Sequence, residues 1–242
     1  MIQIKWTSLE KTLMNIKDLH PQPAKKYIPE WYKKTPVTNN KKRKMENIQN
    51  YKKLMPIGRT VKTCPSFHDV FEDGIVLLSP CDIFFSYKDD KYEWQISVNS
   101  QYINCEFHES EQFLNHYLDK SIKAVFKINM PYLFETPKGY SIRQIPYMYA
   151  DHTDWYVPYG IVDSDKYHEF NPQILFTTSK DEILIKRGQP LCYLVPFKRE
   201  NVKIKTLSKA KDAQKLIEKY YTTQFNNATS FRSQYHKRNI KD

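Results

Sequence analysis

The feature that most constrains the fold is a series of short apolar runs that begins near residue 60 and continues to residue 200. Eight runs of four to seven residues are rich in Ile, Val, Leu, Phe and Tyr, and turn-forming residues separate them. They occupy residues 74–78, 81–87, 92–98, 123–128, 140–145, 173–178, 182–185 and 191–195. Runs of this length and composition are typical of strands in antiparallel sheets. The sequence therefore predicts a mainly β domain over residues 60–200, built as a sandwich or a barrel.

Two segments have the pattern of helices instead. Residues 109–120 interrupt the β-like runs, and residues 208–224 follow them. In each segment the apolar residues fall on one helical face. These residues are Phe113, Tyr117 and Leu118 in the first helix and Leu216, Ile217 and Tyr220 in the second. The residues from Phe225 onward are polar and basic, which predicts a tail.

The first 59 residues differ from the rest, with proline and lysine around a few aromatic side chains. A short helix is expected within residues 6–19. Pro21, Pro23, Pro29 and Pro36 then favour extended backbone, because proline fixes φ and restricts the residue before it. The segment is therefore expected to be an extended arm, packed either on its own domain or against a neighbouring subunit. Its candidate contact residues are Lys25, Lys26, Tyr27, Trp31, Tyr32, Lys33 and Lys34.

The net charge of +11 is distributed unevenly along the chain. Residues 1–60 hold 14 Lys and Arg against 4 Asp and Glu, and residues 201–242 hold 10 against 3. Residues 61–200 are acidic, with 14 basic against 20 acidic side chains. Basic ends around an acidic middle favour contact with an anionic partner, nucleic acid included, or with neighbouring subunits. The alternative is that the charge serves solubility.

Five glycines and four isolated cysteines limit the chemistry that the chain can support. So few glycines argue against a glycine-rich phosphate-binding loop. Cys64, Cys81, Cys105 and Cys192 form no CxxC pair and accompany no cluster of histidines, so buried thiols are expected and no metal or cofactor is. The sequence contains no run of about 18 apolar residues, which argues against a membrane span.

Three motifs in the second half of the chain resemble those of the β-clip enzymes dUTPase and dCTP deaminase. Residues 136–141 (TPKGYS) match a P-x-G-Y turn, residues 160–165 (GIVDSD) match a G-V-I-D-S-D-Y element, and residues 186–190 (KRGQP) match the start of a closing strand. The resemblance implies a β-clip fold over about 134–197. It also implies a pocket in which Asp163 positions and activates the hydrolytic water. Asp165 and Tyr167 would line this pocket, and Arg143 would contact phosphate.

Other motifs of these enzymes are missing from the sequence. Residues 143–148 (RQIPYM) stand where the enzymes have an R-S-S phosphate motif, and residues 188–193 (GQPLCY) stand in place of G-D-R-I-A-Q. The glycine-rich C-terminal motif is also absent. Because a triphosphate site needs several backbone N–H groups and cations that converge, we expect a shared fold without the catalysis.

Over a larger part of its length, the chain resembles a family of uncharacterised proteins from tailed phages. The matching segments are residues 23–34 (PAKKYIPEWYKK), 60–69 (TVKTCPSFHD), 136–141 (TPKGYS), 186–190 (KRGQP) and 195–199 (VPFKR). This resemblance implies a phage origin and a place in the virion, which is assembled in the host cytoplasm. The implied partners are other phage structural proteins and further copies of the same chain.

Five large aromatic residues lie close together between the β-clip-like motifs. They are Tyr147, Tyr149, Trp155, Tyr156 and Tyr159. One interpretation is a loop packed over the end of the barrel. The other is a surface that contacts protein or carbohydrate, because Tyr and Trp dominate such contacts.

The leading functional interpretation is a non-enzymatic structural or assembly protein of a phage virion, whose basic arm and tail contact neighbouring subunits. Two alternatives stay open. The first is a nucleotide- or sugar-binding protein or enzyme that uses the dUTPase-like pocket. The second is a basic DNA-binding protein that acts through its two ends.

Overall fold

The chain forms two compact units, which are defined by contacts along the backbone. The computed structural model describes residues 2–37, 60–64, 67, 69, 71, 74–88, 91–108, 112, 122–147, 150, 154–207 and 210–225. The first unit, called the β unit, comprises residues 1–34 and 70–199. The second unit comprises residues 35–69 and 200–242.

The β unit consists of short strands that all pair antiparallel. Among the described residues there are fourteen: β1 (Lys5–Ser8), β2 (Gln22–Pro23), β3 (Ile75–Leu78), β4 (Ile83–Lys88), β5 (Lys91–Ile96), β6 (Asn104–His108), β7 (Ala124–Asn129), β8 (Tyr132–Glu135), β9 (Tyr140–Pro146), β10 (Trp155–Tyr156), β11 (Gly160–Val162), β12 (Gln173–Phe176), β13 (Glu182–Ile185) and β14 (Pro190–Lys198). They form four sheets, with the orders β1-β8, β10-β12-β7-β6, β11-β9-β14-β3-β2 and β13-β4-β5. The prediction of a mainly β, antiparallel fold is confirmed.

The eight predicted runs all became strands, namely β3, β4, β5, β7, β9, β12, β13 and β14. In β13 the reason is visible in the burial pattern, since Ile183 and Ile185 are buried while Glu182 and Leu184 are exposed. Successive side chains of a strand point to opposite faces, so this alternation places one apolar face against the core. The β-clip resemblance itself stays a prediction.

The five-stranded sheet is organised around β14, its longest strand. On one side β14 pairs with β9 from Cys192 opposite Pro146 to Lys198 opposite Tyr140. On the other side it pairs with β3, and Gly74 lies just before that strand with φ of +74°. A Cβ atom at Gly74 would lie 2.3 Å from the carbonyl oxygen of Leu194, so only glycine allows this close approach.

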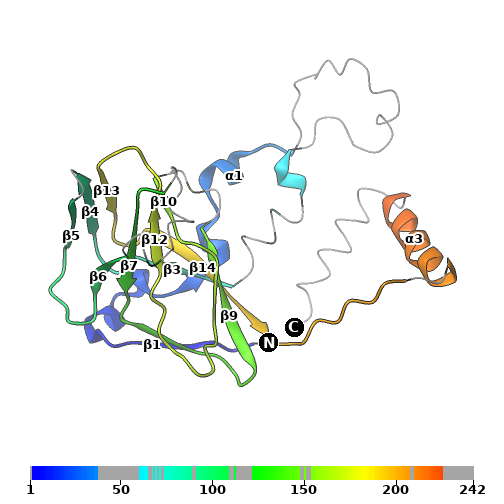
Figure 1. Ribbon diagram of the computed structural model, residues 1–242, viewed down its shortest axis with the longest axis horizontal. Coiled ribbons are helices and arrows are strands. Elements are labelled where there is room, and N and C mark those ends of the chain that lie inside the picture. Colours follow the sequence, from blue (N-terminus) through cyan, green and yellow to red (C-terminus); the bar gives the residue numbers. More distant parts are fainter. Residues whose placement is uncertain are drawn as a thin grey trace, which may run out of the picture. The chain divides into compact units, whose positions relative to one another are not determined.

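One continuous core joins the sheets. The rings of Phe85 (β4) and Phe126 (β7) lie 4.3 Å apart, which links the three-stranded to the four-stranded sheet. Ile142 (β9) and Leu194 (β14) belong to the same buried cluster and bring in the five-stranded sheet. In Figure 1, β4, β5 and β13 are drawn at one side of the β unit and β9 with β14 at the other. The unit therefore buries a single core among all its layers.

The N-terminal 34 residues belong to the β unit and do not form a separate arm, which corrects the predicted domain boundary at residue 59. β1 pairs with β8, and β2 pairs with β3. Short helices follow these strands, namely the 3-10 helices η1 (Lys11–Asn15), η2 (Lys17–Leu19) and η3 (Ala24–Tyr27) and the α-helix α1 (Glu30–Lys34). Leu13, Leu19, Ala24 and Tyr32 are buried, so the segment contributes to the core. The N-terminal segment was expected to pack either on its own domain or against a neighbouring subunit, and in the structure residues 2–34 pack on their own domain.

The helix expected within residues 6–19 is also corrected, because the first part of this segment is β1 and the rest is 3-10 helix. Trp6 explains the difference. Its ring packs edge-on against His20 and against Tyr132 of β8, with 4.7 Å and 6.3 Å between the ring centroids. These contacts across the sheet outweigh the local helical spacing, as tertiary packing commonly does.

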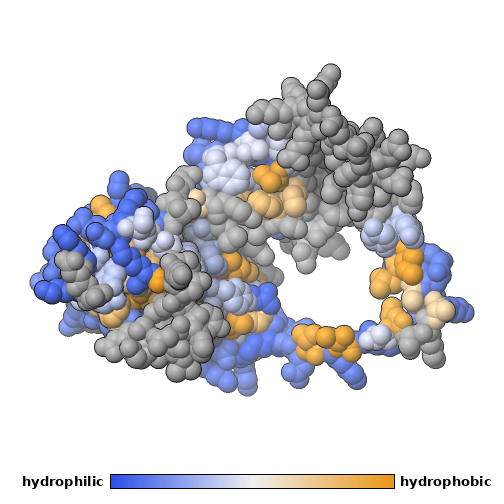
Figure 2. Space-filling view, turned by 45° about the horizontal axis from the view of Figure 1, so that its top comes forward, coloured by the Kyte–Doolittle hydropathy of each residue, from blue (hydrophilic) through white to orange (hydrophobic). Residues whose placement is uncertain are grey.

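The second unit contains α3 (Ala210–Phe225), which confirms the predicted C-terminal helix, and a short 3-10 helix, η4 (Val61–Thr63). A strap of residues 200–207 without regular structure precedes α3. Apolar surface lies along this strap and on α3 (Figure 2). The helix predicted over residues 109–120 and the tail lie outside the described residues, apart from Gln112 and Phe225. No helix in the described part of the chain is long and apolar enough to cross a membrane.

Candidate functional site

The best-defined polar cluster of the β unit lies where two tight turns meet the end of β14. The first turn leads into β9: Tyr140 N–H donates to the Pro137 carbonyl at 3.0 Å, and Gly139 adopts φ of +84°. The second follows β11, where the N–H groups of Lys166 and Tyr167 both donate to the Asp163 carbonyl at 2.9 Å. Both turns carry the motifs that resemble the β-clip enzymes.

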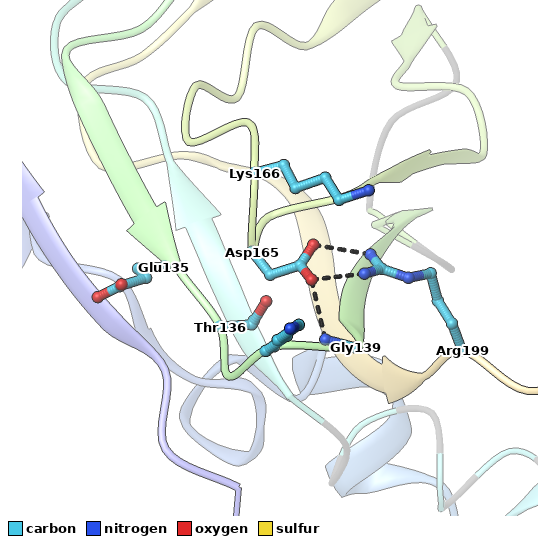
Figure 3. A pocket seen from close by; sticks show the side chains of 7 residues that line it. Glu135, Thr136, Gly139, Asp165, Lys166 and Arg199 are labelled. Carbon is cyan, nitrogen blue, oxygen red and sulfur yellow. Dashed lines mark hydrogen bonds and ion pairs between the residues drawn. The ribbon is translucent and has the colours of Figure 1, made fainter.

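Arg199, the residue that follows β14, joins these turns. Its backbone N–H donates to the Gly139 carbonyl at 2.8 Å, which holds the end of the strand beside the first turn. Its guanidinium grips Asp165 with two hydrogen bonds, Nη1 to Oδ1 at 2.8 Å and Nη2 to Oδ2 at 2.5 Å (Figure 3). The Gly139 N–H donates to the same carboxylate at 2.8 Å. A planar guanidinium facing a carboxylate in this way forms the strongest type of ion pair in proteins.

Asp163 takes part through one of its two oxygens. Oδ1 accepts a hydrogen bond from Ser141 Oγ at 2.6 Å and lies 3.2 Å from Arg199 Nη1. Ser141 Oγ also accepts from Arg199 Nη1 at 2.9 Å. Asp163 and Asp165 thus belong to one turn, at its start and in its middle, and the single positive charge of Arg199 is shared between their carboxylates.

These contacts set the protonation of the cluster. The hydrogen bonds from Arg199 and from the Gly139 N–H hold the pKa of Asp165 well below its usual range. The hydrogen bond from Ser141 and the charge of Arg199 lower the pKa of Asp163 as well. The bonds to Asp165 raise the pKa of Arg199 in return. Both carboxylates are therefore ionised and weakly basic, which does not suit a general base that works near neutral pH.

An open hollow of about 470 Å³ lies beside the cluster. It is lined by Glu135, Thr136, Lys138, Gly139, Asp165, Lys166 and Arg199 (Figure 3). The side chain of Asp165 is only 5% exposed, and Arg199 covers it. Figure 3 shows Glu135 pointing away from the arginine, and Glu135 pairs with Lys5 at 2.9 Å. The arrangement ties three chain segments together and leaves no carboxylate directed at the hollow without a partner.

The other two residues of the expected pocket lie elsewhere. Arg143 lies over the ring of Phe197 at 4.1 Å, on the exposed face of β9 and β14. Tyr167 is exposed and its hydroxyl donates to Glu169 at 3.2 Å. Of the predicted pocket residues, only Asp163 and Asp165 share one cluster. Of these four residues, only Asp165 lines the hollow.

The aromatic residues between the two turns have different roles. Trp155 is buried in the core. Tyr147 is half-buried, lies 5.2 Å from the ring of Tyr193 and donates its hydroxyl to the Tyr27 carbonyl at 2.6 Å. Tyr156 and Tyr159 are exposed, and Tyr149 lies outside the described residues. Packing therefore accounts for Trp155 and Tyr147, while a contact surface stays a prediction for the exposed Tyr156 and Tyr159.

The candidate contact residues of the N-terminal segment divide in the same way. Tyr32 is buried against Phe71 at 4.7 Å, so it cannot reach a neighbouring subunit. Tyr27 and Trp31 are half-buried. Four lysines of the segment are exposed, namely Lys25, Lys26, Lys33 and Lys34. The segment thus presents positive charge, while its aromatic side chains pack within its own unit.

The cysteines follow the expectation of buried thiols at three of four positions, because Cys64 is only half-buried. Burial raises the pKa of Cys81 to about 11 and that of Cys105 to about 12, and it raises the pKa of Cys192 as well. Such thiols are unreactive. Within the described part of the chain, no group of three or more His, Cys, Asp or Glu side chains could hold a metal ion.

Sequence analysis missed Arg199 as a member of the cluster. The segment 195–199 belongs to a matching motif, but nothing in its spacing relates it to Asp165, which lies 34 residues earlier. No protein-family model matches this chain, and no curated protein matches it significantly.

Proposed function

We propose that this protein is a non-enzymatic structural or assembly protein of a phage particle, and that it makes subunit contacts through its C-terminal segment. The observation that carries the proposal is exposed apolar surface on the described residues of that segment. Val202 and Ile204 of the strap are 89% and 88% exposed. The side chains of α3 add Leu216, Ile217, Tyr220 and Tyr221, all exposed.

The pattern of these side chains is that of a binding segment. On α3 the four apolar residues recur at intervals of one and three, so they form one stripe, while Lys211, Lys215 and Lys219 lie on another face. On the strap Val202 and Ile204 alternate with Lys203 and Lys205. An isolated helix of 16 residues is only marginally stable in water, so α3 gains most of its stability when its stripe is covered. Exposed apolar stripes of this kind mark sites of protein contact.

The cluster at Asp165 supports the non-enzymatic part of the proposal. Both aspartates of the dUTPase-like motif bind Arg199, and their lowered pKa values make them poor bases. The phage context rests on the resemblance of five segments of the sequence. Further copies of this chain and other structural proteins of the particle are the proposed partners.

Two measurements test the proposal. Mass spectrometry of purified particles of the phage that encodes the chain is expected to detect the protein at a fixed copy number. Sedimentation of the pure protein is expected to show association that the double variant Leu216→Asp, Ile217→Asp reduces. The control is Lys215→Glu, which changes the charge more than either single substitution but leaves the apolar stripe intact. Absence from mature particles would contradict the proposed function, and a wild-type chain that stays monomeric would contradict the proposed subunit contacts.

A further inference from the structure

The edge strand β11 of the five-stranded sheet has features of a self-pairing interface. On one side β11 pairs with β9, and on its other side β11 pairs with no strand in the described part of the sheet. An unpaired edge presents N–H and C=O groups that can extend the sheet with a strand from another chain. Natural edge strands are commonly protected by charge or proline. Within Gly160–Val162 there is neither.

The exposed face beside this edge is apolar and aromatic. Tyr159, Ile161 and Asp163 follow one another at period two, so their side chains form one row along the edge. In the register of the sheet, Ile161 pairs with Arg143 of β9, and Arg143 pairs in turn with Val195 of β14. Aromatic residues and arginine, as found in this row and in the Arg143–Phe197 pair, are enriched at the centres of protein interfaces.

The row is complementary to itself about Ile161. If two copies pair antiparallel with Ile161 opposite Ile161, then Tyr159 of each copy lies opposite Asp163 of the other. The hydroxyl of Tyr159 has no hydrogen-bond partner among the described residues, and the same holds for Oδ2 of Asp163, since Ser141 and Arg199 both engage Oδ1. The hydroxyl of Tyr159 in each copy can then donate a hydrogen bond to the ionised carboxylate of Asp163 in the other copy. The two-fold axis gives two such bonds, and no like charges lie opposite each other.

We propose that two copies of this chain pair through β11 about a two-fold axis at Ile161, which extends the five-stranded sheet across both molecules. This proposal rests on the assembly function proposed above and names the surface of the β unit that takes part. The apolar pair Ile161–Ile161 forms its centre, and two Tyr159–Asp163 hydrogen bonds fix its register. The interface is isologous, so it closes after two copies and leaves α3 available for other contacts.

A second edge strand provides a matched comparison. Leu184 lies at the middle of the outward row of β13 and is 51% exposed, against 55% for Ile161. β13 is also the end of its sheet in the described residues. In the same antiparallel register Glu182 of one copy would lie opposite Lys186 of the other, which is an exposed ion pair of the kind that contributes little to association, and the row contains no aromatic side chain. Equal exposure in a different setting makes Leu184 the control for Ile161.

The register can be tested by disulfide trapping in the full chain with Cys64→Ser as background, because the other three cysteines are buried. Under mild oxidation Ile161→Cys is expected to form a covalent dimer, and Leu184→Cys is not. Tyr159→Cys alone should not cross-link to itself, whereas a mixture of Tyr159→Cys and Asp163→Cys should give mixed dimers. Failure of Ile161→Cys to cross-link, or equal cross-linking of Leu184→Cys, would overturn the proposal.

Sedimentation separates this inference from the proposed function. Ile161→Arg is expected to weaken dimerisation about tenfold or more, since it places two like charges at the centre of the pair. If the α3 variant abolishes association and Ile161→Arg leaves it unchanged, the β11 pairing is wrong while assembly through the C-terminal segment stands. If Ile161→Cys cross-links in register but the protein is absent from particles, the pairing stands and the proposed function is wrong.

Discussion

Two glycines with similar backbone angles have very different surroundings. Gly74 and Gly139 both lie in the left-handed region, with φ of +74° and +84°. A Cβ atom added at Gly139 would meet no atom within 4 Å, whereas at Gly74 it would lie 2.3 Å from the backbone oxygen of Leu194. The first position needs glycine for its conformation only, and the second needs it for space as well.

This difference predicts unequal costs of substitution by alanine. Gly139→Ala is expected to lower the free energy of unfolding by about 1 kcal/mol, the cost of a left-handed non-glycine residue. Gly74→Ala is expected to cost about 3 kcal/mol or more, because β14 or the turn must also move. Urea denaturation of the two variants measures both values. Equal losses would show that the contact between Gly74 and β14 does not matter for stability.

Arg199 predicts a dependence of stability on pH. Asp165 has a lowered pKa in the folded chain, so its contribution is fully present above its unfolded pKa of about 4 and is lost as the pH falls through the folded value. Arg199→Met removes the main cause of this shift. The difference in unfolding free energy between wild type and variant should therefore be largest near neutral pH and narrow below about pH 4.

Denaturation at several pH values measures this difference. Lys5→Met is the control, because it breaks the exposed pair with Glu135 and should change stability little. A difference for Arg199→Met that stays constant from neutral to acid pH would show that the ion pair with Asp165 is not its source.

Among the elements, those with strong patterns were predictable and those that depend on a partner were not. The eight apolar runs became strands because their composition and alternation suffice. β1, β2, β6, β8, β10 and β11 were missed as strands. β10 has two residues and β11 has three, so each is too short to have a sequence pattern of its own and is defined by its pairing with the neighbouring strand. In the same way, the proximity of Asp163 and Asp165 followed from spacing, but Arg199 joined them only through the register of β14 with β9.

The N-terminal segment gives a prediction at this scale. Leu19 is buried in the core, while Met14, five residues earlier, is exposed. Leu19→Ala is expected to lower the free energy of unfolding by about 3 kcal/mol, and Met14→Ala by less than about 0.5 kcal/mol. Thermal or urea denaturation of the full chain measures both. A small effect of Leu19→Ala would mean that residues 2–34 do not stabilise the β unit.

For the molecule as a whole, the charge division predicts how association responds to salt. The surfaces proposed for contact are apolar or pair phenol with carboxylate, so sedimentation should show self-association nearly unchanged between about 50 and about 200 mM salt. Binding to duplex DNA through basic ends would instead fall by orders of magnitude over that range. Fluorescence anisotropy with a labelled duplex measures the second quantity. Tight, strongly salt-dependent DNA binding, without salt-resistant self-association, would favour the DNA-binding alternative.

The position of Arg199 also determines how the β unit responds to mechanical force. The strap begins at residue 200, so tension on a bound C-terminal segment enters the β unit at Arg199, which Asp165 and the Gly139 carbonyl hold in place. Behind it β14 runs through the middle of its sheet, between β9 and β3. A pull along this strand loads its hydrogen bonds in shear, so many must break together instead of one after another. We therefore expect the β unit to resist a pull directed along β14 better than a pull that peels this strand from one end.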